Sequence, residues 1–346
     1  MDRESLWWNY VAGAARYVND TLTAATGHRA LLLEEIPFMS YYLRLIQEKL
    51  LQWDSSLQFE VSEADQWIGG DDIGEMLMNQ YAPSNEYHPL DGPRAGYIAK
   101  HNLIQGRVLI VRRIERRSEW LPLAIEYARN SGTQNGLLVL TFTGSCPLAT
   151  ARKGLAMPQW NTYITNYDMQ LFASYCISGK ANLQLSLRHY ITQIASRMAG
   201  KDPELCSVLA VEELAYSPVT VLRKHAGTYE IAARLADDLK AVESVLWEAQ
   251  IQTVYPIVEQ MRRRFIEEYT TELRNVLPQR DEFGKYLLTP EDMELRHMWY
   301  YFFKVSGFSN SADGHTFKMI YDARNNLAHL VPLDNATVIS ILALEA

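Results

Sequence analysis

Short apolar runs separated by helical patterns constrain the fold of this chain more than any other feature of its first half. Five segments are predicted to be strands, the first a buried apolar run and the second an alternating segment, at residues 30–33, 57–61, 108–111, 137–142 and 161–166. Strands that alternate with helices are typical of an α/β layer fold, in which a largely parallel sheet is covered on both faces. We therefore expect an α/β domain over residues 1–180.

Helical periodicity lies before and between these strands. An opening amphipathic helix is predicted to run through Trp7, Val11, Ala15 and Val18. The glycine-rich segment at residues 69–74 is not preceded by a strand. We therefore interpret it as a turn followed by a helix N-cap rather than as a dinucleotide-binding loop.

The five strands and their intervening helices resemble the core of a P-loop NTPase. That resemblance implies a glycine-rich phosphate loop with Lys and Ser/Thr after the first strand. Residues 34–40 (EEIPFMS) instead offer no glycine or lysine, a proline that lacks an amide donor, and two carboxylates that repel a triphosphate. The third strand ends in Arg112 and Arg113, where this family would place acidic residues that hold Mg²⁺. We expect a degenerate, ATP-independent domain that binds no cofactor and acts as a scaffold or sensor.

The remainder of the chain is predicted to be helical. Residues 181–239 form short amphipathic pieces, with Pro203 and Pro218 at helix ends, and indicate a small helical middle domain. Residues 240–346 indicate a helical bundle with long helices at residues 242–254, 257–273, 291–303 and 315–330. Ser311 or Asp313 is expected to cap the last of these helices.

The last helix ends in the segment RNNLAH at residues 324–329. The guanidinium of Arg324 presents a fork of donors that grips a phosphate bidentately and stays protonated. The imidazole of His329 exchanges a proton near neutral pH, and the amide of Asn325 can orient either group. Together these groups are able to stabilise a phosphorane and to move the 2′-hydroxyl proton of RNA without a metal.

This spacing resembles the R-x(4-6)-H motif of the HEPN (higher eukaryotes and prokaryotes nucleotide-binding) superfamily. In that superfamily the motif lies on a late helix of a short all-helical bundle, which matches its place within residues 240–346. The resemblance implies a metal-independent endoribonuclease of toxin or anti-phage defence type that dimerises to build one composite site. By motif position it assigns the catalytic roles to Arg324, Asn325 and His329, with no metal ion.

Helical geometry adds a reason for dimerisation. Five residues along an ideal helix correspond to about 140° of rotation and about 7.5 Å of rise. Arg324 and His329 of one chain should therefore project from different faces. A twofold axis that laid one motif antiparallel to another would bring two Arg and two His side chains together. We therefore expect a homodimer formed through the C-terminal bundle.

Other interpretations of these residues stay open. The segment also suits an ordinary helix end, with a histidine facing inward and Pro332 closing the element. The neighbouring Arg262, Arg263 and Arg264 either contact RNA or form a solvated helix face. Glu294 and His297, one turn apart, either line the same groove as Arg324 or belong to the edge of the core.

Composition limits how this chain could bind RNA and where it acts. A formal net charge of −8 argues against coating nucleic acid through a broad basic surface, so any RNA contact should be local. The apolar runs fall short of the roughly 18–20 residues that a membrane span requires, and the acidic N-terminal residues are not typical of a secretory signal. The 3 scattered cysteines match neither a disulfide framework nor a zinc site. These features favour a cytoplasmic protein without membrane contact.

Two functions from different classes follow. The first is an RNA-cleaving toxin or anti-phage defence effector, restrained by the pseudo-NTPase domain and open to a regulatory protein partner. The second is a non-catalytic interaction or scaffold protein within a larger defence assembly, because the first domain has already lost the chemistry of nucleotide hydrolysis.

Overall fold

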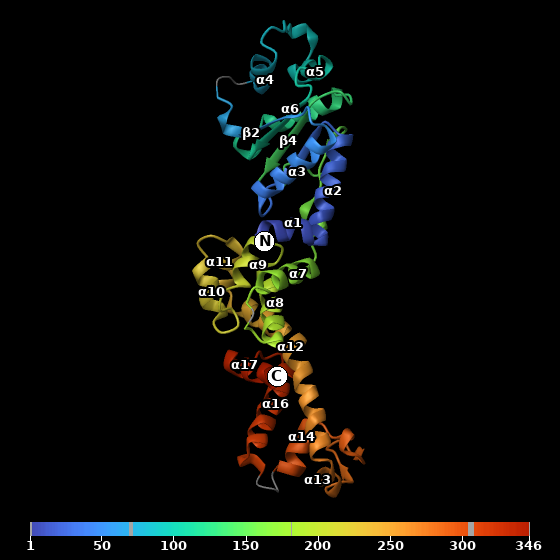
Figure 1. The fold of residues 1–346 in the computed structure, drawn as a ribbon, viewed down its shortest axis with the longest axis vertical. Helices are drawn as coiled ribbons and strands as arrows, with labels where there is room; N and C mark the ends of the chain where they lie inside the picture. Colours follow the sequence, from blue (N-terminus) through green and yellow to red (C-terminus); the bar gives the residue numbers. More distant parts are fainter. Residues whose placement is uncertain (1, 69–71, 181, 304–307, 346) are drawn as a thin grey trace. The chain divides into compact units, whose positions relative to one another are not determined.

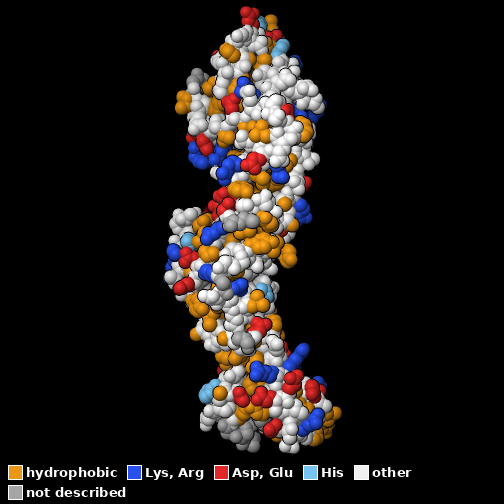
Figure 2. Space-filling view, viewed as in Figure 1, with side chains coloured by type: hydrophobic (Ala, Val, Ile, Leu, Met, Phe, Trp, Pro, Cys, Tyr) orange, Lys and Arg blue, Asp and Glu red, His pale blue; other side chains and the backbone are white. Residues whose placement is uncertain are grey.

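The computed structural model describes residues 2–68, 72–180, 182–303 and 308–345 (Figure 1). Its contacts divide the chain into two compact units, Met1–Asp168 and Met169–Ala346. The division into three domains at residues 180 and 239 stays a prediction. On the face drawn in Figure 2, acidic side chains lie among the basic ones on both units, in keeping with the acidic net charge.

A parallel sheet forms the centre of the first unit. Its described strands are β1 (Ala30–Glu34), β2 (Gln58–Glu63), β3 (Arg107–Arg112), β4 (Leu137–Phe142) and β5 (Leu155–Ala156). They are ordered β2-β3-β4-β1-β5, and every pairing between neighbours is parallel. The expectation of an α/β domain with a largely parallel sheet is therefore confirmed, and the first four strands lie where the sequence predicted them.

The prediction of a fifth strand at residues 161–166 is wrong. That segment contains the end of a 3₁₀ turn (Trp160–Thr162) and the first residue of helix α7 (Asn166–Ile177). The cause is a capping arrangement: Thr165 Oγ1 accepts the backbone N–H of Asp168, and the Asp168 carboxylate accepts the backbone N–H of Thr165. Such reciprocal capping starts a helix, so the apolar residues before it do not extend as a strand.

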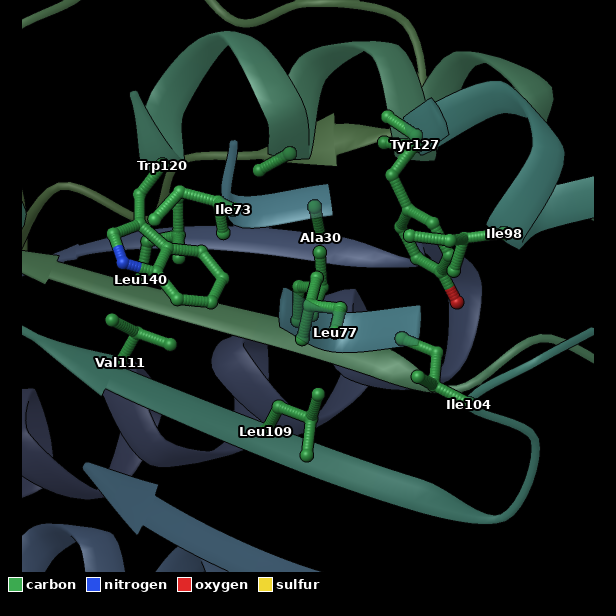
Figure 3. Packing of buried hydrophobic residues seen from close by; sticks show 14 of the residues in the cluster. Ala30, Ile73, Leu77, Ile98, Ile104, Leu109, Val111, Trp120, Tyr127 and Leu140 are labelled. Atoms are coloured by element: carbon green, nitrogen blue, oxygen red, sulfur yellow. The ribbon is translucent and has the colours of Figure 1, made fainter. Parts of the chain in front are cut away.

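Helices cover both faces of the sheet. Against one face pack α4 (Ile73–Tyr81), α5 (Arg94–Lys100) and α6 (Trp120–Asn130), as Figure 3 shows for Leu77, Ile98, Trp120 and Tyr127 over Leu109, Val111 and Leu140. The alternate residues Leu31 and Leu33 are also buried, and α2 (Ala12–Gly27) packs against β1, with α3 (Met39–Trp53) beside it. Burial on both faces explains why β1, β3 and β4 are largely apolar, whereas the partly exposed β2 alternates with polar residues.

The opening helix predicted through Val11 and Val18 is two helices. Helix α1 (Arg3–Tyr10) ends at Val11, whose backbone is extended at φ −93° and ψ 119°, and α2 begins at Ala12. Gly13, in the first turn of α2, allows a close approach of the chain, because a Cβ at this position would lie 2.6 Å from the carbonyl oxygen of Tyr163. The Gly13 N–H also donates to the Asp168 carboxylate at 2.9 Å. The first turn of α2 is therefore in close contact with the segment that precedes α7.

The glycine-rich segment acts as expected where it is described. Asp72 caps α4 by accepting the backbone N–H groups of Gly74 and Glu75, which agrees with the predicted turn and N-cap. Residues 69–71 of that segment lie outside the described residues.

The second unit is built from helices and one short hairpin. Its elements before the bundle are α8 (Leu185–Ala199), α9 (Pro203–Leu209), α10 (Pro218–His225) and α11 (Glu230–Asp237), followed by α12 (Leu239–Glu268) and α13 (Thr270–Asn275). Then come the antiparallel pair β6 (Gln279–Arg280) and β7 (Tyr286–Leu287), α14 (Leu295–Met298), a π-helical turn (Trp299–Phe303), α16 (Ala312–Ala328) and α17 (Asn335–Leu342). The prolines at residues 203 and 218 begin helices, as expected.

Two helix predictions in this unit are wrong. The helices expected at residues 242–254 and 257–273 are largely one, because α12 runs through Pro256 with Val254, Ile257 and Val258 buried on either side of it. The helix expected at residues 291–303 begins only at Leu295. Its first residues are interrupted by Met293, whose backbone is extended, and by Glu294, which forms a capping box with His297. Burial around Pro256 keeps α12 continuous where the sequence predicted a break. The cap formed by Glu294 and His297 starts α14 later than its hydrophobic periodicity predicted.

The carboxyl ends of β1 and β4 lie where a nucleotide would bind in an open α/β sheet. The connection after β1 leads toward β2, whereas the connection after β4 crosses β1 to reach β5. Crossovers that leave in opposite directions create the switch point at which such sheets bind ligands. Arg112 donates two hydrogen bonds to Glu35 at this point, at 2.9 and 2.7 Å, and Thr141 donates a third at 2.6 Å.

This ion pair is a stabilising feature of the sheet. Burial alone would raise the pKa of Glu35, but the hydrogen bonds from Arg112 and Thr141 lower it below its usual value. A lowered carboxyl pKa contributes stability above the unfolded value of about 4, and that contribution is lost as the pH falls through the folded value.

We predict that Arg112→Met lowers the free energy of unfolding by about 3 kcal/mol, because it leaves the Glu35 carboxylate buried without its charged partner. The double change Glu35→Gln with Arg112→Met should recover most of that loss. Urea unfolding of the full chain, followed by circular dichroism at pH 7, measures both. Equal destabilisation by the single and double changes would contradict the role assigned to the pair.

Candidate functional site

The segment at residues 324–329 lies at the C-terminal end of α16. The start of this helix is set by its N-cap residue. Ser311 accepts the backbone N–H of Gly314 at 3.0 Å, so Ser311 rather than Asp313 is the N-cap. The carboxylate of Asp313 instead accepts the hydroxyl of Tyr269 at 2.6 Å. The stripe that faces the interior consists of Gly314, Phe317, Ile320, Ala323 and Leu327.

The end of α16 is fixed from outside the helix. His329 is the C-cap residue, and its backbone N–H donates to the carbonyl groups of Asn325 and Asn326. Leu330 follows with a φ of 62°, the left-handed conformation that commonly ends a helix. The indole N–H of Trp247 on α12 donates to the carbonyl of Leu327 at 2.8 Å. The same carbonyl also accepts the backbone N–H of Leu330 at 3.3 Å, so the indole adds a second, shorter hydrogen bond at the helix end.

A second side chain of α12 holds the chain just beyond the segment. The amide of Gln250 is completely buried, accepts the backbone N–H of Leu333 at 2.7 Å and donates to the Leu333 carbonyl at 3.1 Å. The chain is therefore anchored on both sides of His329.

The candidate catalytic side chains are not enclosed in the hydrophobic interior. Arg324 is one third exposed, Asn325 is half-buried and His329 is exposed. Arg324 lies between the buried positions Ala323 and Leu327, off the interior stripe. On an ideal helix Arg324 and His329 would lie about 140° apart, so we expect one chain to present its guanidinium and its imidazole in different directions.

Glu294 is the charged partner of Arg324. Its Oε2 atom lies 3.6 Å from Nη2 of Arg324 and 3.3 Å from Nε of Arg296. The sequence had raised Glu294 as a possible neighbour of Arg324, and the structure places it there. Arg296 was not considered from the sequence. Arg296 lies two residues after Glu294, at a helix start that the sequence did not predict. Helical spacing therefore did not indicate that Arg296 would lie close to Glu294.

His297 is largely buried, at 7% exposure, and lies beside Arg296 in the wall of a cavity. Its Nδ1 atom accepts the backbone N–H of Glu294 at 3.1 Å, which completes the cap of α14. Burial and the charge of Arg296 lower the pKa of His297 below its usual value, against a smaller opposing effect of Glu294. His297 is therefore neutral near pH 7 and serves first as a structural cap.

The three neighbouring arginines on α12 differ from one another. Arg262 donates to the carboxylate of Glu259 at 2.9 Å and to the carbonyl of Met293 at 3.1 Å, so its guanidinium is occupied by the fold. Arg263 and Arg264 are exposed. Of the candidate RNA contacts, these two have side chains at the surface.

No protein-family model and no curated protein sequence matches this chain. Within the described ranges, no helix combines the length and the apolar character that crossing a bilayer requires. In the same residues, no group of three or more His, Cys, Asp or Glu side chains is placed to hold a metal ion.

We predict that Trp247→Phe loosens the end of α16, because it removes the donor to the Leu327 carbonyl at a cost of about 1 kcal/mol. Hydrogen exchange of the amides of His329 and Val331 should become roughly fivefold faster, the factor that corresponds to this energy. Trp53→Phe is the matched control, since Trp53 is 65% exposed and belongs to the other unit. Unchanged exchange in Trp247→Phe would show that this bond does not hold the helix end.

Proposed function

We propose that this chain is a metal-independent endoribonuclease of HEPN type that acts as a toxin or anti-phage defence effector. The observation that carries the proposal is the placement of Arg324, Asn325 and His329 at the C-terminal end of α16, with His329 as the C-cap residue. All three side chains reach the surface, on a helix end that α12 holds from outside. Surface access is what a substrate requires, and a fixed backbone is what positioning requires.

The residues suit cleavage by the substrate's own 2′-hydroxyl. The 2′-oxygen bonds to phosphorus and the bond from phosphorus to the 5′-oxygen breaks, which leaves a 2′,3′-cyclic phosphate and a new 5′-hydroxyl. Arg324 grips the phosphate and stabilises the negative charge of the transition state. His329 takes the 2′-proton and delivers it to the leaving 5′-oxygen. Asn325 orients one of these groups.

This chemistry needs two copies of the chain. Because the guanidinium and the imidazole of one copy project in different directions, a twofold groove is the simplest way to bring Arg324 of one chain to His329 of the other. The composite site is therefore part of the proposal, and the partner copy contributes catalytic residues.

The N-terminal unit is proposed to regulate rather than to hydrolyse nucleotides. The position where a P-loop would hold phosphates carries Glu34 and Glu35, and the Glu35 carboxylate is joined to Arg112 and Thr141. The same observation favours the second candidate function, a non-catalytic scaffold in a larger assembly. The two candidates differ in whether the RNNLAH segment cleaves RNA.

We predict that the full chain cleaves total RNA in the presence of a metal chelator and leaves 2′,3′-cyclic phosphate ends. Arg324→Ala and His329→Ala should each lower the rate by at least about 100-fold, the usual loss for a transition-state contact or a general acid–base group. His315→Ala and Arg223→Ala are matched controls, because both side chains are exposed on helices of the same unit. Equal cleavage by all five proteins would contradict the proposal that Arg324 and His329 catalyse RNA cleavage, and would favour the scaffold function.

We predict that a mixed dimer of one Arg324→Ala chain and one His329→Ala chain retains roughly half of the wild-type rate, because one intact Arg–His pair remains across the twofold axis. Co-expression with two different affinity tags and purification over both isolates that dimer. A mixed dimer as inactive as its two parents would contradict a site shared between chains, and so would recovery of monomers alone.

A further inference from the structure

A cavity of about 480 Å³ lies in the second unit between the β6–β7 hairpin, α14 and α16. Its lining includes Arg280, Arg296, His297, Trp299, Tyr300 and Tyr321. The volume falls within the roughly 300–1,000 Å³ of sites that bind small molecules or single residues of a polymer. The combination of several aromatic rings with guanidinium groups is the feature that suggests an occupant.

The aromatic rings are already arranged for stacking. Trp299 stacks on Tyr321 with ring centroids 5.9 Å apart and planes 14° apart, and the Lys318 ammonium lies 5.3 Å from the centre of each ring. Tyr300 is 59% exposed at the edge of this group. Half-exposed aromatic rings beside cations are the common means of holding unpaired nucleic-acid bases.

His297 supplies an independent sign that the cavity receives a polar group. The side chain is 7% exposed, and its Nε2 atom has no hydrogen-bond partner among the described residues. Because Nδ1 accepts the Glu294 N–H, the neutral ring carries its proton on Nε2 and has a donor to offer. A buried donor without a partner is costly, and an acceptor entering the cavity would remove that cost.

The cavity adjoins the proposed catalytic residue. Tyr321 precedes Arg324 by one helical turn, and the Glu294 carboxylate contacts both Arg296 in the cavity wall and Arg324 beside it. A base in the cavity would therefore bring the sugar-phosphate backbone of the same strand toward Arg324. The two guanidinium groups that line the cavity are matched by the carboxylates of Asp281 and Glu282, and Glu282 pairs with Arg296. The occupant therefore need not carry a large charge of its own.

We infer that this cavity binds one unpaired base of single-stranded RNA, stacked on the aromatic rings, and so selects unpaired RNA as the substrate class. The inference rests on the proposed function for its biological meaning but predicts a binding event that does not depend on cleavage. Because the rings recognise a base face, binding should require bases and not only a phosphate chain.

The test uses the full chain and a fluorescent 2′-O-methyl RNA dodecamer, whose blocked 2′-oxygens cannot attack the phosphate. Fluorescence anisotropy gives the dissociation constant for this probe and for a matched probe that lacks bases at four central positions. We expect the abasic probe to bind about tenfold more weakly to the wild-type chain, which corresponds to loss of one good base stack. Tyr300→Ala should bind the intact probe about tenfold more weakly and should barely distinguish the two probes. Tyr167→Ala, which removes another exposed tyrosine outside the cavity, should behave like the wild type.

The outcomes separate this inference from the proposed function. Equal binding of both probes by the wild-type chain overturns base recognition, whether or not the chain cleaves RNA. The same result needs no mutation and so does not depend on how Tyr300→Ala folds. Base-dependent binding that Tyr300→Ala abolishes supports the inference even if cleavage is absent. Base-dependent binding that Tyr300→Ala leaves unchanged overturns the assignment to this cavity.

Discussion

The buried amide of Gln250 is the interaction on which the geometry of the candidate site depends. It exchanges two hydrogen bonds with the backbone of Leu333, just after α16 ends. Removing a partner from a completely buried amide leaves polar groups without hydrogen bonds, at a cost of about 1–3 kcal/mol. Trp247, three residues earlier on the same helix, binds the Leu327 carbonyl just before His329. Two side chains of α12 thus position the RNNLAH segment, although neither belongs to the motif.

Much of the first unit followed from local sequence. Strands β1, β3 and β4 are buried on both faces, so their runs of Leu, Val and Ile could be recognised from the sequence alone, whereas β2 is partly exposed and was recognised by its alternation. The fifth strand was not, because β5 is only two residues long and pairs with Ala30 and Leu31 at one edge of β1. Its pairing with β1 depends on the three-dimensional path of the chain. A segment of two residues is too short to show the hydrophobic periodicity from which a strand is predicted.

The second unit shows a different limit. The core stripe of α16 and the position of Arg324 off that stripe follow from helical spacing alone. The neighbourhood of Arg324 does not, because Glu294 and Arg296 belong to a helix start set by the extended backbone of Met293 and the cap made by His297. Sequence reasoning placed a single long helix there. It named Glu294 as a possible neighbour but could not see that one carboxylate would contact both Arg296 and Arg324.

Two arginine–glutamate pairs in this chain show how geometry decides which guanidinium can accept a phosphate. Arg112 meets Glu35 through two hydrogen bonds at 2.9 and 2.7 Å, and the two side chains are only 20% and 12% exposed. A phosphate would have to break a bidentate pair in a largely dry environment, which is costly. Arg324 approaches Glu294 at 3.6 Å, beyond hydrogen-bond distance, with the two side chains 33% and 50% exposed.

Solvent-screened pairs of this second kind contribute about 0–1 kcal/mol, so a phosphate can replace or join the carboxylate at little cost. The chain therefore offers a phosphate-accessible guanidinium at Arg324 rather than at Arg112. That difference places the proposed RNA contact on α16 and leaves the switch point of the sheet to a structural role.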